Sequence, residues 1–148
     1  MSALRAEAPI ERIDAAAFRI PTDAPEADGT FAWDSTTMVA VRVHAGGEAG
    51  FGYTYADGCL VSLIGGALAD TICGRDAFET PGAWEAMQRT VRNLGRSGLA
   101  ACAISAVDAA LWDLKARLAG VPLAMLLGRR REAVEIYGSG GFTTYSDA

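Results

Sequence analysis

Hydrophobic and polar positions alternate along the first part of the chain, and this alternation predicts a β-sheet. Within Thr36–His44 (TTMVAVRVH), the valines at alternate positions 39–43 fall on one side of an extended backbone. An imperfect alternation over Ile10–Ile20 predicts an earlier strand that ends at Pro21. We therefore expect two neighbouring strands before the middle of the chain.

A glycine-rich turn and a third strand are predicted next. Ala45–Gly50 (AGGEAG) contains the residues that hairpin turns favour, and Phe51–Tyr55 (FGYTY) reads as a strand beyond it. Phe51, Tyr53 and Tyr55 share one face of that strand, because side chains alternate along an extended backbone. The three segments together predict an antiparallel meander.

The segment between the first two strands is predicted as a loop. Thr22–Asp34 (TDAPEADGTFAWD) contains Pro25, Gly29 and several acidic residues, which are typical of loops. It is longer than most connections in compact domains, and loops of that length are often functional lids. Phe31 and Trp33 are apolar side chains that a purely solvated loop has little reason to contain.

Apolar residues change to helical spacing after Gly58, and several glycines mark the ends of the helices. The pattern predicts helices from Leu60 to near Gly74, from Thr80 to about Leu94 and over Ser97–Ala119, with a short helical turn over Pro122–Leu127. The apolar stripe of the first helix consists of Leu60, Leu63, Ile64, Leu68 and Ile72, and that of the third consists of Ile104, Val107, Leu111, Leu114 and Leu118. Alanines beside the second stripe would let other elements approach closely.

One more strand is predicted near the C-terminus, at Ala133–Tyr137 (AVEIY). No later segment of the sequence offers this strand a partner. We therefore expect an α+β fold, in which a three-stranded antiparallel meander precedes a helical bundle and a last strand is left without a partner.

Composition narrows the classes of function. The 148 residues are 51% hydrophobic and 21% charged, which is enough for one domain with a real core. A net charge of -5 argues against broad binding of nucleic acid. No apolar run approaches the roughly 20 residues that span a bilayer, and the N-terminus lacks the apolar centre of a secretory signal. We expect a cytoplasmic protein without nucleic-acid or membrane partners.

Few side chains are suited to nucleophilic or acid–base chemistry. Cys59, Cys73 and Cys102 form no Cys-x-x-Cys pair, and we expect each to be reduced and buried. His44 is the single histidine and is expected to be exposed and uninvolved. Lys115 is the single lysine, so a lysine base with a tuned pKa is scarcely available in this chain.

One segment carries a family signature. Ala103–Gly128 (AISAVDAALWDLKARLAGVPLAMLLG) combines small residues with Asp108, Asp113, Arg117 and Pro122. It resembles the signature of the mandelate racemase and muconate lactonizing branch of the enolase superfamily. The two aspartates lie about 140° apart around a helix, so they do not converge on one metal ion. We expect both to be structural, through hydrogen bonds to loop backbone or to a neighbouring arginine.

The resemblance implies an N-terminal capping domain over residues 1–130, followed in residues 131–148 by the first strand of a TIM-like barrel, which would be a second domain. In this family the barrel supplies three carboxylates for a magnesium ion, together with Lys or His acid–base residues. The shared reaction removes the proton α to a carboxylate, which implies a racemase, an epimerase or a dehydratase of a hydroxy acid or acid sugar. These catalytic and metal-binding groups lie outside this chain, so the 148 residues alone are expected to be inactive. The complete enzyme is expected to be a homo-oligomer.

The resemblance also implies substrate contacts from the capping domain. The loop containing Phe31 and Trp33 corresponds to the family's substrate lid, although packing on the rim of the barrel would explain both residues equally well. Tyr55 ends the third strand where the family points a residue into the pocket, with Tyr53 beside it; packing in the sheet core is the alternative for Phe51 and Tyr53. Ser139 matches a substrate-contacting position at the end of the first barrel strand, or it is a serine of a glycine-flanked turn.

A second class of function stays open on the sequence alone. The chain could form a freestanding, non-catalytic α+β module that binds a partner through the surface that a barrel would otherwise cover. Because a monomer rarely exposes a large apolar patch, that reading requires a stable and monodisperse monomer in solution.

Overall fold

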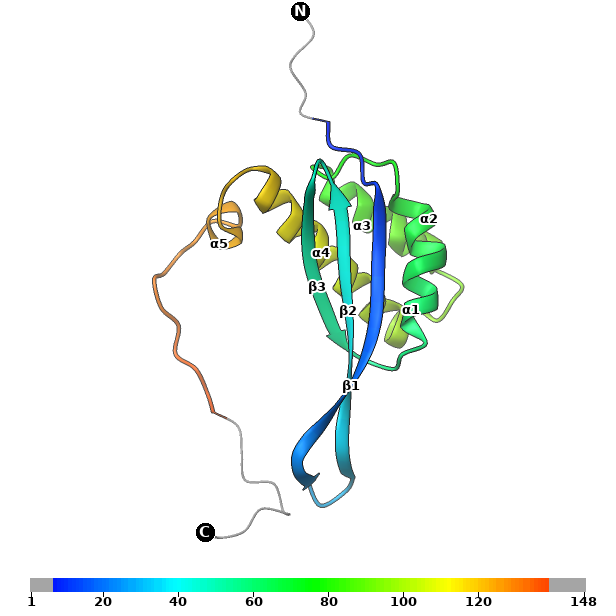
Figure 1. Ribbon diagram of the computed structural model, residues 1–148, viewed down its shortest axis with the longest axis vertical. Helices are drawn as coiled ribbons and strands as arrows, with labels where there is room; N and C mark the ends of the chain where they lie inside the picture. The colour runs from blue at the N-terminus through cyan, green and yellow to red at the C-terminus, as the bar shows by residue number, and fades with distance from the viewer. Residues whose placement is uncertain (1–6, 139–148) are drawn as a thin grey trace, which may run out of the picture.

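The computed structural model describes residues 7–138, which form a three-stranded antiparallel sheet covered on one face by helices (Figure 1). The strands β1 (Arg12–Ala27), β2 (Ala32–Ala45) and β3 (Glu48–Tyr55) lie in the order β1-β2-β3. This confirms the predicted meander, with the tight turn at Gly46 and Gly47, whose positive φ angles suit glycine.

The helices follow the sheet in sequence and confirm the predicted helical bundle. The first predicted helix is one continuous rod made of α1 (Leu60–Leu63), a π-helical segment (Ile64–Leu68) and α2 (Ala69–Ile72). It is followed by α3 (Thr80–Thr90), a kinked segment (Arg96–Ala100) in which Ser97 and Gly98 have non-helical backbone angles, α4 (Ala101–Leu118) and α5 (Leu123–Leu126). The helix predicted to reach about Leu94 ends at Thr90, and its chain then turns at Gly95, which has a φ of 72°.

One core lies between the sheet and the helices. The predicted apolar stripes point into it: the three valines of β2 are buried, as are four residues of the first helical rod and four of α4. These residues are Val39, Val41, Val43, Leu60, Ile64, Leu68, Ile72, Ile104, Val107, Leu111 and Leu114.

Strand β3 and helix α4 touch through their backbones. Gly50 and Gly52 of β3 face α4, and a Cβ atom at Gly52 would overlap the carbonyl oxygen of Ala106 and lie 2.7 Å from the amide nitrogen of Ala110. The small residues of α4 therefore allow the close approach that the sequence predicts. This contact fixes how the sheet sits on the helices, and it leaves Phe51, Tyr53 and Tyr55 on the opposite, exposed face of β3.

The helical stretch that includes α4 bears on the prediction that no segment is long and apolar enough to span a membrane. The helical stretch Arg96–Leu118 is long and apolar enough to cross a bilayer by length and composition, contrary to the expectation that no run approaches that length. In this fold its apolar stripe packs in the core, as in the central helix of a globular domain.

Two predictions about the first strands are wrong. Strand β1 does not end at Pro21, and Thr22–Asp34 is not a loop: β1 and β2 continue as a paired arm up to the pair Ala27 and Ala32. Proline has no backbone N–H to donate to a neighbouring strand. It is tolerated here because β1 is an edge strand, and no described strand pairs with its outer side. The register shifts between Pro21 and Glu26, where the pairing is interrupted and then resumes.

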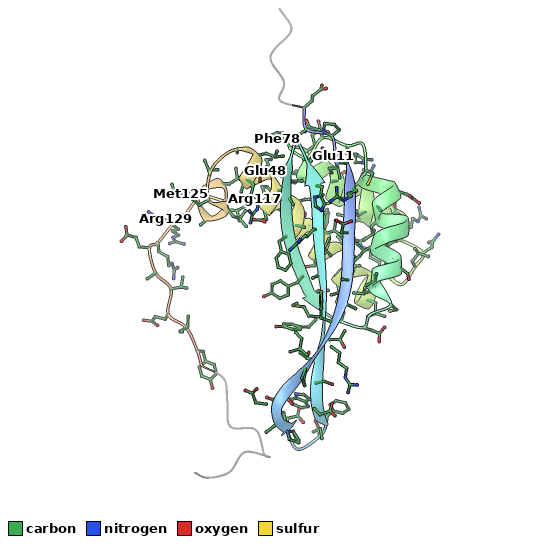
Figure 2. The ribbon with its side chains drawn as sticks, in the orientation of Figure 1. Glu11, Glu48, Phe78, Arg117, Met125 and Arg129 are labelled. Carbon is green, nitrogen blue, oxygen red and sulfur yellow. The ribbon has the colours of Figure 1, made fainter. Side chains whose placement is uncertain are left out.

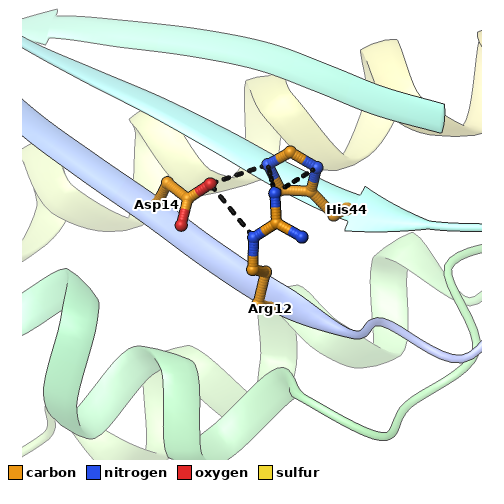
Figure 3. A network of polar contacts seen from close by, with 3 residues as sticks. All are labelled: Arg12, Asp14 and His44. Atoms are coloured by element: carbon orange, nitrogen blue, oxygen red, sulfur yellow. Dashed lines mark hydrogen bonds and ion pairs between the residues drawn. The ribbon is translucent and has the colours of Figure 1, made fainter. Parts of the chain in front are cut away.

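His44 is not exposed and uninvolved, as the sequence analysis expects. Its side chain is 17% exposed, and its Nε2 lies 2.8 Å from Oδ2 of Asp14 (Figure 3). Arg12 completes the network, with Nη2 placed 3.2 Å from both ring nitrogens of His44 and Nε 3.2 Å from Asp14. The network joins β1 to β2 on the face of the sheet opposite to the helices, because Arg12 and His44 are paired across the two strands.

The cysteine and C-terminal predictions also differ from the structure. Cys59 and Cys73 are exposed rather than buried, because Cys59 precedes the first helical rod and Cys73 follows it. The strand predicted at Ala133–Tyr137 is not formed, and Ile136 and Tyr137 are 90% and 92% exposed. A strand needs a hydrogen-bonded neighbour, and no described segment pairs with this one.

Candidate functional site

The end of the paired β1–β2 arm is the first part of the candidate site. The arm, residues 21–35, continues past the layer of helices and protrudes from the body of the domain (Figure 1). A turn at residues 28–31 closes it, with Gly29 at a φ of 90°. The arm therefore presents its tip to whatever lies beyond this end of the sheet.

Asp28 organises the turn at the tip. Its Oδ1 accepts hydrogen bonds from the Thr30 hydroxyl at 2.7 Å, the Thr30 amide at 2.9 Å and the Phe31 amide at 3.0 Å. These bonds, the hydroxyl bond first, lower the pKa of the Asp28 carboxyl below its ordinary value because they stabilise the ionised form. The tip is an ordered Asx turn, and the Asp-Gly-Thr sequence contains the signal for it.

Phe31 and Trp33 lie together just after this turn. Their rings stack with centroids 6.2 Å apart and planes 16° from parallel. Trp33 also donates a hydrogen bond from Nε1 to Oε2 of Glu26 across the arm, at 2.6 Å. Phe31 is 70% exposed, so the tip offers an exposed aromatic ring on a hydrogen-bonded support.

The second part of the candidate site is a row of aromatic rings along β3. Phe51, Tyr53 and Tyr55 follow one another with centroid separations of 6.1 and 5.9 Å. The packing of Phe51 and Tyr53 in the sheet core, which the sequence analysis holds open, does not occur. Alternate glycines of β3 face α4, so the rings lie on the open face of the sheet, where Tyr55 is 64% exposed.

The structure brings the predicted residues together only in part. Tyr55 pairs with Met38 of β2, whereas Trp33 lies five residues earlier in the same strand, which corresponds to about 16 Å along an extended chain. The pair Phe31 and Trp33 and the pair Tyr53 and Tyr55 therefore form separate clusters towards one end of the sheet. Ser139, the remaining predicted contact, lies outside the described residues.

The sheet has a shallow depression that is lined by residues of all three strands. The depression, of about 420 Å³, is lined by small residues at its centre and by Phe18, Met38, Arg42 and Phe51 around it. A second depression of about 530 Å³ lies between β3, α4 and α5, beside Arg117 (Figure 2). Both are mainly apolar, so the surface suits a packed neighbour better than bulk water.

Asp113 behaves as the sequence analysis expects. Its Oδ2 accepts hydrogen bonds from the Phe51 amide and from Nε of Arg117, both at 2.8 Å. The bond to Asp113 is the main cause that raises the pKa of Arg117 above its ordinary value. Asp113 therefore has a structural role, as predicted.

Asp108 does not make the hydrogen bonds that the sequence analysis expects of it. Its carboxylate has no hydrogen bond or ion pair within residues 7–138, and partial burial raises its pKa. In the described part of the chain, no group of three His, Cys, Asp or Glu side chains could hold a metal ion, so Asp108 is not part of such a group.

Sequence reasoning treats Glu26 and Asp28 only as acidic residues of a loop, and it missed their contacts and the network of Arg12, Asp14 and His44. The Asp-Gly-Thr turn is readable from local sequence, but the partners of Trp33 and His44 depend on strand register. Register across a shifted pairing is set by the three-dimensional structure, so no sequence signal identifies Glu26.

Comparison with known proteins assigns this geometry to a family. Residues 14–128 match the family described as mandelate racemase / muconate lactonizing enzyme, N-terminal domain. L-talarate/galactarate dehydratase of Salmonella typhimurium is 40% identical over 109 residues, which cover 71% of this chain and 27% of that enzyme.

Two solved structures resemble the fold. A mandelate racemase/muconate lactonizing enzyme-like protein from Rubrobacter xylanophilus matches 93% of this chain and 38% of its own, with a TM-score of 0.90 and 51% identity. L-talarate dehydratase from Polaromonas sp. JS666, complexed with Mg and L-glucarate, matches 94% of this chain and 40% of its own, with a TM-score of 0.82 and 29% identity. The chain thus spans between about a quarter and two fifths of the length of these relatives.

Proposed function

Because the chain belongs to the mandelate racemase / muconate lactonizing enzyme family, we propose that it is the capping part of an enzyme that removes the proton α to a carboxylate. The favoured reaction is dehydration of an acid sugar, with racemisation or epimerisation of a hydroxy acid as the related alternative within the family. The observation that carries the proposal is the match over residues 14–128, supported by similarity to a dehydratase complexed with Mg and L-glucarate.

The proposal separates the catalytic groups of the enzyme from its capping domain. The α-proton of a carboxylate is very weakly acidic, so positive charge must meet the developing oxyanion. Residues 7–138 contain no cluster that fits a magnesium ion, and the single lysine, Lys115, is bound to the carbonyl oxygen of Phe78 at 2.8 Å. The proposal assigns the magnesium ion and the acid–base residues to a barrel domain that begins at residues 131–148, after a capping domain of residues 1–130.

The capping domain contributes substrate contacts and excludes water. Phe31 and Trp33 on the arm would form a lid over the barrel mouth, and Tyr55 with Tyr53 would line the side of the pocket near the end of β3. Ser139 would contact the substrate carboxylate from the first barrel strand. Closing such a site removes water and strengthens the electrostatic interactions inside it.

The open face of the sheet supports the same proposal. Its aromatic row and its two shallow depressions are apolar surfaces that a larger body would cover. The complete protein would be a cytoplasmic homo-oligomer whose partners are its carboxylate substrate and magnesium.

A direct assay tests the proposed function. The protein that continues this chain is incubated with a panel of aldonic and aldaric acids and Mg²⁺, and 2-keto-3-deoxy acids and epimers are measured as products. We expect magnesium-dependent turnover of at least one acid sugar and no turnover by residues 1–148 alone. Turnover by the 148-residue chain, or none by the complete protein on any α-hydroxy acid, would overturn the proposal.

A further inference from the structure

The arm contains a side-chain contact between Glu26 of β1 and Trp33 of β2. The two residues are directly paired across the strands, and Nε1 of the indole donates to Oε2 of the carboxylate at 2.6 Å. Hydrogen bonds to ionised acceptors are shorter and stronger than neutral ones. Glu26 therefore fixes the rotation of the Trp33 ring and not merely its position in the strand.

The register shift explains how Glu26 reaches this place. The pairing of β1 with β2 is interrupted after Pro21 and resumes at Glu26. Irregularities of this kind re-aim side chains along a paired strand. The irregular stretch 22–25 therefore sets which side chain of β1 stands opposite Trp33.

A second constraint acts on Trp33 from the turn. Phe31 stacks on the indole ring, and the Phe31 amide is bound to Asp28. Trp33 is thus held by a hydrogen bond at its nitrogen and by a ring on its face. Ordering a side chain before binding removes an entropy cost that binding would otherwise have to meet.

This geometry determines which kind of contact Trp33 can make with a ligand. Its indole N–H is already engaged by Glu26, and the indole has no other hydrogen-bond donor. Trp33 therefore presents an apolar ring to its surroundings, which suits the C–H face of a hydroxylated carbon chain better than its hydroxyl groups.

We propose that Glu26 is a positioning residue that holds Trp33 as a preformed wall of the substrate pocket. The inference rests on the proposed function for the identity of the ligand, but the Glu26–Trp33 contact itself does not. Its role is distinct from the chemical step, because Glu26 acts on the substrate through Trp33.

Nuclear magnetic resonance of the 148-residue chain tests the contact without any activity. The indole N–H signal of Trp33 is assigned with Trp33→Phe, and its exchange with water is compared in wild type, Glu26→Ala, Glu26→Gln and Asp23→Ala. We expect at least tenfold faster exchange in Glu26→Ala and partial protection in Glu26→Gln, which keeps an acceptor. The matched control Asp23→Ala, an exposed acid on the same arm, should leave the signal unchanged. Equal exchange in wild type and Glu26→Ala would overturn the proposal.

Steady-state kinetics of the complete enzyme test the consequence. We expect Glu26→Ala to raise KM about tenfold while kcat changes less than twofold, with Glu26→Gln recovering most of the loss. An unchanged KM with an altered indole signal would also overturn the positioning role. If the complete protein acts on no carboxylate at all, the proposed function fails, while the exchange experiment still decides whether Glu26 holds Trp33.

Discussion

The carboxylate of Asp113 in α4 accepts a hydrogen bond from the backbone N–H of Phe51 in β3, with 2.8 Å between Oδ2 and N. Because β3 is an edge strand, this N–H points away from β2 and would otherwise face solvent or another chain. Arg117 binds the same carboxylate oxygen and holds it in place. A signature residue of the family thus attaches the helix to the edge of the sheet.

Replacement of Asp113 should destabilise the domain measurably. We expect Asp113→Ala to lower the free energy of unfolding by about 1–2 kcal/mol, because it leaves the Phe51 N–H without its partner. Urea denaturation followed by circular dichroism measures the change. Glu85→Ala is the matched control, since it removes an exposed pair with Arg89 one turn apart in α3 and should cost at most about 0.5 kcal/mol. Equal effects of the two substitutions would contradict a structural role for Asp113.

A methyl group at Gly52 should be tolerated far less than one at Gly65. Gly52→Ala forces a Cβ atom into the backbone of α4, and we expect a loss of about 3 kcal/mol or more in the free energy of unfolding. Gly65→Ala, in the first helical rod, meets open space and should stabilise the domain by about 0.5–1 kcal/mol. Thermal unfolding of both variants gives the comparison, and a stable Gly52→Ala domain would show that the two elements do not pack as closely as described.

The sequence predicts those parts of the fold that depend on local pattern. The apolar stripe of α4 and the valines of β2 identify their elements because burial imposes a period on each. The β1–β2 arm was missed because Pro21 and Gly29 are typical of loops. Pro21 is tolerated in β1 because β1 is an edge strand, and Gly29 lies in the turn that closes the arm. Pattern also shows that Tyr53 and Tyr55 share a face, but not which face lies outward.

The sequence predicts only those residues of the candidate site that stand out in their local segment. Phe31 and Trp33 stand out as apolar residues in a polar segment, and Tyr55 stands out as the end of a strand. The contacts of Glu26 and of His44 could not be predicted, because each partner comes from the neighbouring strand through a register that the sequence does not state. The outward position of the β3 rings follows from Gly50 and Gly52, whose packing against α4 was not foreseen.

The turn at the tip of the arm should lose order in acid. Its hydrogen bonds lower the pKa of Asp28 below the ordinary 3.8, so their contribution is complete above that pH and is lost as the pH falls through the lower folded-state pKa. We expect the amide signals of Thr30 and Phe31 to be constant from pH 8 to about 5 and to shift only below about 4. Asp28→Asn, which keeps an acceptor without the charge, should abolish the titration. A midpoint at or above 3.8 would contradict the proposed turn geometry.

Asp108 should destabilise the isolated domain at neutral pH. Burial raises its pKa, so the folded state holds this proton more tightly, and stability falls as the pH rises from the unfolded pKa through the folded one. Asp108→Asn should therefore raise the free energy of unfolding at pH 7, by less than about 1 kcal/mol because solvent screens a half-exposed group. The gain should shrink towards pH 3.5. Asp70→Asn, at an exposed helical position, is the control, and equal gains from both substitutions would contradict the burial argument.

The central claim is that this chain caps an enzyme that removes the proton α to a carboxylate. Its most direct test is ¹H nuclear magnetic resonance of acid sugars incubated in D₂O with the complete protein and Mg²⁺. We predict that at least one acid sugar loses its α-proton signal, through exchange or elimination, and that EDTA prevents the loss. Retention of every α-proton across the panel, with the protein folded and magnesium present, would contradict the claim.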